Sequence, residues 1–234
     1  GYPLDLDRIS GILDRAEKRI GFRPFVIEDC AHAYNSAYKG KLLGNHNSMA
    51  CFSLQAIKHF TSVDGGFLTM PNEKLYKRAK LLRWYGIDRE SPREEFRCEE
   101  DVKEWGFKFH MNDVNATIGM HNHPHINKLV KAFKDNSACY DNELQGITGV
   151  TSMRRDEWAD SASWIHTIKV ERRDDFSRHM DAHGIMTSRV HERNDKHSCV
   201  EQYKTSLPKL DELVKEMICI PNGWWVSEDD RQYI

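Results

Sequence analysis

Residues 26–66 read VIEDCAHAYNSAYKGKLLGNHNSMACFSLQAIKHFTSVDGG. Two short apolar runs in and beside this stretch, residues 25–27 and 49–52, are typical of buried strands, and a third run follows at residues 66–70. Residues 5–20 carry apolar side chains at the three-and-four spacing of an amphipathic helix, and Asp5 is a fitting N-cap for it. A helix followed by strands in this order predicts an α/β fold, in which helices cover a mostly parallel sheet.

Polar side chains follow the first two predicted strands at the point where each strand ends. Asp29 comes after the first strand, and Ser53 and then Lys58 come after the second. In an α/β protein, groups at the carboxyl ends of the strands face the ligand crevice. We therefore expect these three residues, together with His32, to form a site.

The second half of the chain has a different pattern. Apolar spacing predicts a long helix that starts near residue 126 and ends near residue 145. Short strands and helices alternate after it, with strands expected at residues 150–153, 164–170, 186–190 and 217–220 and helices at residues 174–183 and 208–216. This pattern predicts two domains: residues 1–127 as the C-terminal part of a large domain, and residues 128–234 as a small α+β domain.

Composition excludes several classes of protein. The net charge is −2 with acids and bases interspersed, so the chain has no overall field for nucleic acid or an anionic membrane. No apolar run approaches the ~20 residues that a membrane-spanning helix needs. The six cysteines are scattered without a C-x-x-C pair, which suits a reducing cytoplasm, and Cys51 in its apolar run is expected to be buried.

Three other kinds of site receive less support. His121, His123 and His125 alternate, but no carboxylate stands at ligand spacing on the same face, so solvated histidines are favoured over a metal site. No G-x-x-x-x-G-K-[ST] phosphate loop is present. Basic residues and a tryptophan gather at residues 77–89, but a charge run on an outer helix face is usually solvated. The acidic run 94–104, within the long aperiodic connection 86–106, would also repel nucleic acid.

Pyridoxal phosphate chemistry suits the four residues at the strand ends. It requires a lysine for the Schiff base, a carboxylate for the pyridine nitrogen, and donors for the phosphate. Lys58, Asp29 and Ser53 supply these groups. Spacing alone does not decide the matter, because lysines and aspartates are common.

The sequence resembles the DegT/DnrJ/StrS-type nucleotide-sugar aminotransferases, which are pyridoxal-phosphate enzymes of fold type I. The resemblance covers nearly the whole chain and is carried by VIEDCAHAYNSAYKGKLLG, ACFSLQAIKHFTSVDGGFLT, KRAKLLRWYGIDR, GFKFHMNDVNATIG and LPKLDELVKEMICIPNG. It implies that Lys58 is the Schiff-base lysine and that Asp29 is the partner of the pyridine nitrogen. It also implies that His32 lies beside the cofactor ring and that Ser53 contacts the phosphate.

The same resemblance implies a reaction. Family members transfer an amino group from an amino acid, usually glutamate, to a nucleotide-linked keto-sugar, and they are homodimers whose active sites share residues. Lys108 stands where many members have an asparagine that reaches the phosphate across the dimer. Four residues are weaker candidates for substrate contacts: Tyr85 in the large domain, and Arg189, His191 and Arg193 in the small one.

The match begins roughly a third of the way into a family member, which predicts an N-terminally truncated chain. An alternative function is therefore a truncated or degenerate member without catalysis, which acts as an interaction module or exists only as a partial clone. The intact pair of Asp29 and Lys58 favours the enzyme.

Overall fold

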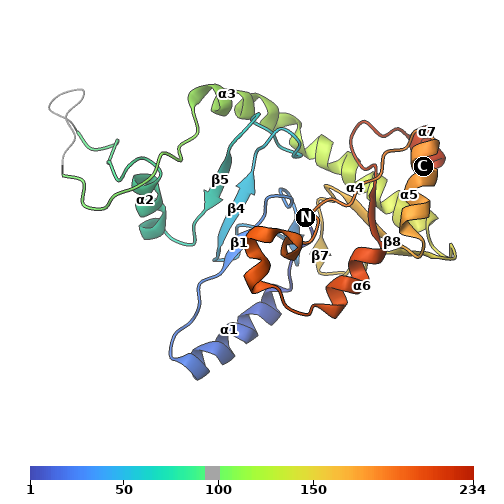
Figure 1. Ribbon diagram of the computed structural model, residues 1–234. Helices are drawn as coiled ribbons and strands as arrows, with labels where there is room; N and C mark the ends of the chain where they lie inside the picture. Colours follow the sequence, from blue (N-terminus) through green and yellow to red (C-terminus); the bar gives the residue numbers. More distant parts are fainter. Residues whose placement is uncertain (93–100) are drawn as a thin grey trace. The chain divides into compact units, whose positions relative to one another are not determined.

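The computed structural model describes residues 1–92 and 101–234, and these divide into two compact units (Figure 1). The first unit contains Gly1–Asn127 together with Trp158–Ser161, and the second contains Lys128–Glu157 and Ala162–Ile234. Part of the long connection expected at residues 86–106 lies outside the described residues. No helix among the described residues has the length and apolarity needed to cross a membrane.

The first unit begins with α1 (Leu6–Ile20), which has the predicted caps. The side chain of Asp5 accepts a hydrogen bond from the Arg8 amide, and Gly21 ends the helix at φ 81°, a left-handed conformation that glycine adopts without strain. The caps and the apolar spacing explain why the sequence located this helix to within one residue at its start.

The main sheet of the first unit has the order β1-β4-β5, formed by Ile27–Asp29, Met49–Ser53 and Gly66–Thr69. β1 runs parallel to β4, whereas β4 and β5 are antiparallel. The chain returns from β4 to β5 through a loop without a crossover helix, and a direct return of this kind gives antiparallel strands. The expectation of a mostly parallel sheet therefore applies here only to β1 and β4.

A second small sheet, with the order β3-β2-β7, consists of Lys41–Leu42, Ala37–Tyr38 and Ala159–Asp160. Its last strand brings Trp158 against Tyr38, with ring centroids 5.3 Å apart. Tyr38 belongs to the buried cluster that also contains Phe52 and Ala50 of β4, and the partly buried Trp158 packs against this cluster. This packing explains why residues 158–161 belong to the first unit.

Two expectations about burial are wrong. Cys51 is exposed, because side chains alternate along β4 and Ala50 and Phe52 take the positions that face the core. The apolar spacing after Asn72, at Leu75, Ala79 and Leu82, predicts a helix with Tyr85 on its inner face. That helix, α2 (Glu73–Leu82), ends earlier, and Tyr85 lies beyond it with φ 56° and is 45% exposed.

Three helical segments follow residue 112: α3 (Asp113–Asn122), η1 (His123–His125) and α4 (Ile126–Glu143). The sequence predicts Asp113 as the N-cap of the first of these helices, because an aspartate there precedes the apolar residues Val114 and Ala116. In the structure Asn112 is the cap and accepts a hydrogen bond from the Asn115 amide.

The second unit has an antiparallel sheet with the order β6-β8-β9, formed by Val150–Ser152, His166–Val170 and Met217–Ile220. Its core contains Tyr140, Ile168, Val170, Ile218 and Ile220. Its helical segments are α5 (Arg173–Ala182), η2 (Asn194–Lys196), η3 (Ser198–Tyr203), α6 (Pro208–Glu216) and α7 (Glu228–Tyr233).

The strand expected at residues 186–190 is not formed. Only Ser188 pairs there, through two backbone hydrogen bonds with Cys219 of 3.0 and 2.7 Å. Met186 is 83% exposed, and His191 has φ 68°, so the segment turns away from the sheet on both sides of one bridge.

Candidate active site

Lys58 lies in a closed loop, residues 54–65, which we call the lysine loop. The Leu54 amide donates to the Gly65 carbonyl (2.9 Å), and the Ser62 amide donates to the Leu54 carbonyl (2.9 Å). Within the loop, the Lys58 amide donates to the Gln55 carbonyl (2.9 Å). The ends of the loop are thus tied together beside the carboxyl end of β4, and Lys58 is held between them.

α3 fastens the lysine loop from the outside. The side-chain amide of Asn115 donates to the Asp64 carbonyl (3.2 Å), and that of Asn122 donates to the Thr61 carbonyl (2.9 Å). Gly119 lies between them, where a Cβ atom would be only 3.2 Å from that of Ser62. Sequence reasoning missed these contacts.

The spacing of Asn115, Gly119 and Asn122 along the sequence could have indicated these contacts. Positions 115, 119 and 122 are four and three residues apart, so they share one face of a helix. Two amides and a glycine on one face indicate a surface that meets backbone rather than an apolar core.

Asp29 is the last residue of β1, and the parallel register places it beside Cys51 of β4. Its carboxylate accepts a hydrogen bond from the Ala31 amide (3.1 Å). Ser53 is the last residue of β4, and its hydroxyl oxygen accepts from the Gln55 amide (3.3 Å). His32 is half-buried in the turn that follows β1.

Asp29 and Lys58 are close enough to interact electrostatically. Partial burial lowers the pKa of the Lys58 amine, and attraction to the Asp29 carboxylate opposes this shift. An amine with a lowered pKa is neutral more often, and only the neutral amine attacks a carbonyl carbon. The structure therefore brings together the acid and the lysine that the sequence singled out.

The neighbouring thiol is not a competing nucleophile. Burial, together with the charges of Glu28 and Asp29, raises the pKa of Cys30 to about 12. The thiolate, which is the reactive form, is therefore scarce at neutral pH.

Lys108 and Tyr85 lie together in a second group of the first unit. The Lys108 amine is 5.9 Å from the centroid of the Tyr85 ring and 4.3 Å from that of Trp84. The backbone joins the same segments, because the Tyr85 amide donates to the Phe107 carbonyl (3.0 Å).

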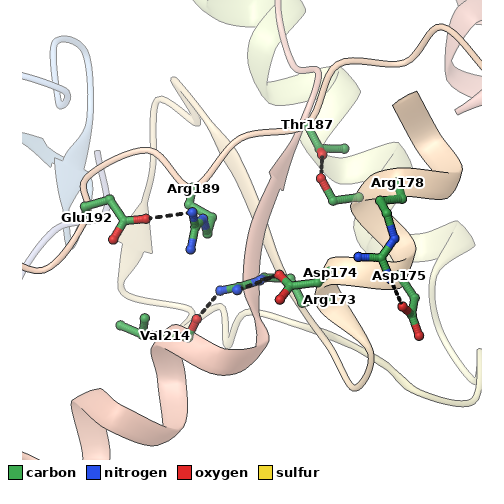
Figure 2. A network of polar contacts seen from close by, with 9 residues as sticks. Arg173, Asp174, Asp175, Arg178, Thr187, Arg189, Glu192 and Val214 are labelled. Atoms are coloured by element: carbon green, nitrogen blue, oxygen red, sulfur yellow. Dashed lines mark hydrogen bonds and ion pairs between the residues drawn. The ribbon is translucent and has the colours of Figure 1, made fainter. Parts of the chain in front are cut away.

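Arg189, His191 and Arg193 belong to the second unit. Arg189 pairs with Glu192 at 3.2 Å and lies near Arg173, as Figure 2 shows. The Arg173 guanidinium is directed to the Val214 carbonyl and to the carboxylate of Asp174.

The guanidinium of Arg193 is bound internally. Asp195 and Asp211 both accept hydrogen bonds from it, and these bonds raise its pKa above the usual range. Arg189 and His191 are exposed. Of the two arginines, Arg189 is thus the better placed to meet a ligand.

The donor set at the strand ends fits pyridoxal phosphate. A carboxylate ends β1, a hydroxyl ends β4, and an amine with a lowered pKa stands in the loop that follows. The alternating histidines contribute no comparable set, since the described residues contain no group of three or more potential metal ligands. One of them, His123, packs its ring against Phe60 with centroids 5.7 Å apart.

Comparison with known proteins gives consistent matches. The pattern of the DegT/DnrJ/EryC1/StrS aminotransferase family matches residues 1–234. The crystal structure of AtS13 from Actinomadura melliaura is 48% identical with a TM-score of 0.95, and the match covers 100% of this chain and 62% of that one. The sugar aminotransferase CalS13 from Micromonospora echinospora is 42% identical with a TM-score of 0.94, over 100% of this chain and 63% of that one.

A curated relative has a named substrate. The UDP-4-amino-4,6-dideoxy-N-acetyl-beta-L-altrosamine transaminase of Campylobacter jejuni subsp. jejuni serotype O:23/36 (strain 81-176) is 27% identical over 180 residues, which are 77% of this chain and 41% of that protein. The chain thus spans less than two thirds of each of these proteins. It belongs to the DegT/DnrJ/EryC1/StrS aminotransferase family.

Proposed function

We propose that this chain forms the lysine-bearing part of a pyridoxal-phosphate-dependent aminotransferase, which moves an amino group from an amino acid to a nucleotide-linked keto-sugar. The observation that carries the proposal is the pairing of Asp29 with an amine of lowered pKa, Lys58, beside the carboxyl ends of two adjacent parallel strands. Membership of the aminotransferase family supports the reaction type.

Each residue of the site has a role that follows from its chemistry. When bound, pyridoxal phosphate supplies an electron sink for the carbon that carries the amino group. The Asp29 carboxylate keeps a ring nitrogen protonated, and the Ser53 hydroxyl donates to a phosphate oxygen. We propose that His32 would lie beside the ring.

Lys58 has two roles. Its neutral amine is the point of attachment for the cofactor aldehyde. Once released, the same amine acts as a general base and takes a proton from the substrate Cα. It then acts as a general acid and delivers the proton to the C4′ position. A lowered pKa helps both roles, because each begins with the neutral amine.

The substrate class rests on the relatives. The Campylobacter protein is named for a UDP-linked amino sugar, and CalS13 is named as a sugar aminotransferase. We propose a nucleotide-linked keto-sugar as the acceptor and glutamate as the donor. We also propose a homodimer, in which Lys108 reaches the cofactor phosphate of the other subunit.

The test is a spectrum of the purified chain, and of the longest protein in which it occurs, with added pyridoxal phosphate. We expect a visible absorption band that is lost in Lys58→Ala and kept in Lys77→Ala, an exposed lysine of α2. Glutamate alone should then change the band and release one equivalent of 2-oxoglutarate, because the amino group stays on the enzyme.

Two results count against the proposal. A band that persists in Lys58→Ala would mean that another amine binds the aldehyde. No band from either form of the protein would favour the alternative, a family member without catalysis that acts as an interaction module.

A further inference from the structure

The basic residues in and after α2 fall into two groups. Three of the four cations within the helix have a carboxylate partner: Lys77 pairs with Glu73, Arg78 with Glu104 and Lys80 with Glu90. Arg83, Arg89 and Lys108 form no ion pair with any described residue. The first group is an ordinary solvated helix face, whereas no carboxylate of residues 1–92 and 101–234 neutralises the second.

Two chain segments hold the unpaired cations together. Trp84 and Lys108 form an antiparallel bridge, and the Phe107 amide donates to the Leu82 carbonyl (2.7 Å). The segments approach so closely that a Cβ atom on Gly106 would lie 2.5 Å from the Leu82 carbonyl oxygen. Such a close approach is possible only with glycine at this position.

The ring of Trp84 is the centre of the group. The Lys108 amine lies 4.3 Å from the ring centroid and the Arg89 guanidinium carbon 4.6 Å. The His110 ring meets it edge-on, with centroids 4.0 Å apart. A cation on an aromatic face is held in position without losing its charge, so a later anion still meets the full charge.

The pKa of His110 indicates a positive electrostatic field around its ring. Its pKa is lowered by burial and then by the charges of Lys108, Arg89 and Arg83, with Asp113 acting in the opposite direction. Its Nδ1 atom is buried and has no hydrogen-bond partner among the described residues. A buried ring nitrogen without a partner, amid unpaired cations, indicates that an anionic group with hydrogen-bonding oxygens completes the arrangement.

We propose that Arg83, Trp84, Arg89 and His110 bind the diphosphate of the nucleotide-linked substrate, next to Lys108, whose proposed partner is a cofactor phosphate. The inference rests on the proposed function and adds a location for the diphosphate. A diphosphate carries several negative charges and many acceptor oxygens, which match two guanidinium groups. A single amino-acid carboxylate would leave one of these two arginines unpaired.

The experiment uses Arg89→Gln and Arg83→Gln in the holoenzyme, with Arg15→Gln as the matched control. Arg15 is an exposed arginine of α1. The probes are inorganic pyrophosphate and UDP, titrated by calorimetry. We expect each cluster variant to weaken both probes by about tenfold or more, the loss for a hydrogen bond to a charged group, and the control to bind as the parent does.

In a second titration, pyridoxal phosphate is added to each variant and its visible absorption band is recorded. This titration distinguishes a site for the substrate diphosphate from a site for the cofactor phosphate. Unchanged affinity for the cofactor together with weakened binding of pyrophosphate supports the inference. Weakened cofactor affinity with unchanged pyrophosphate would assign the cluster to the cofactor and overturn it, as would no effect on either ligand. Arginine-dependent binding of UDP by a protein that shows no transamination would reject the proposed function while keeping the diphosphate site.

Discussion

The proposed chemistry depends on Lys58, and two features of its surroundings shift the pKa of its amine in opposite directions. Burial favours the neutral amine, while the Asp29 carboxylate favours the charged one. Burial is the larger effect, so the pKa lies below the ordinary value of 10.5. An attraction larger than the effect of burial would have reversed this order and made the amine a poor nucleophile.

The first prediction separates these two effects. The rate at which Lys58 reacts with pyridoxal phosphate should rise with pH and reach its midpoint below 10.5. Asp29→Asn removes the attraction that raises the pKa, so the midpoint should move to a still lower pH. Stopped-flow absorbance on the cofactor-free chain measures this midpoint, and a midpoint that moves upward in Asp29→Asn would contradict the electrostatic account.

At this scale the sequence predicted the candidate site in part. Asp29, Ser53 and Lys58 could be found because each follows a recognisable strand, and the resemblance then assigned their roles. The amides of Asn115 and Asn122 were missed, because they bind backbone carbonyls of the lysine loop across more than 50 positions of sequence. Long-range contacts of this kind leave no local pattern beyond a shared helix face.

At the scale of elements, α1 shows how local chemistry determines a boundary. The Asp5 carboxylate accepts from the Arg8 amide (3.0 Å) and from the Tyr38 hydroxyl (3.1 Å). The first bond satisfies an amide that the helix itself leaves without a partner, and the second ties the helix start to β2. One side chain thus both begins the helix and anchors it.

The second prediction concerns this cap. Asp5→Ala should lower the free energy of unfolding by about 1–2 kcal/mol, the usual cost of losing an N-cap. Asp5→Asn keeps an acceptor oxygen and should retain most of the stability. Urea denaturation followed by circular dichroism compares the two variants, and equal losses in both would show that the charge rather than the hydrogen bonds is important.

Elements with a clear period or cap were predicted well, and very short ones were not. The helix at Pro208–Glu216 and the strand at Met217–Ile220 agree with their predicted bounds. β2 and β3 have two residues each, too few to show any alternation. A strand was expected at residues 186–190, but pairing is decided by the partner strand and only Ser188 pairs there.

At the scale of the whole molecule, the family and the fold type I prediction are confirmed by the comparisons. The chain contains two units with separate buried clusters, one around Phe52 and the other around Ile168. Units with their own cores can lose structure separately. Their stabilities should therefore respond differently to a group that is present in one unit alone.

His166 of β8 is such a group. It is fully buried, and its Nδ1 atom lies 2.8 Å from the Ser137 hydroxyl oxygen. Arg155 donates to that oxygen and to the Asp141 carboxylate, each at 3.0 Å, and Asp141 lies 3.9 Å from Nε2. Because Arg155 donates to Ser137, the hydroxyl proton is available for Nδ1, an arrangement that requires the neutral imidazole.

Burial lowers the pKa of His166 to about 4, with the Asp141 carboxylate opposing the shift and Arg155 adding to it. The unfolded chain binds the proton more readily, with an ordinary value of 6.5. Stability from this group is therefore complete above pH 6.5 and is lost as the pH falls toward 4, by up to ~3 kcal/mol.

The third prediction is that acid loosens the second unit first. Between pH 6.5 and 4, hydrogen exchange of the β8 and β9 amides should accelerate more than that of the β4 amides, because His166, with its lowered pKa, belongs to the second unit. His166→Gln removes the titrating group and should flatten this dependence, whereas His197→Gln, an exposed histidine of the same unit, should leave it unchanged. Equal acceleration in β4 and β8 would place the acid-sensitive group elsewhere, and an unaltered slope in His166→Gln would exclude this histidine as the cause.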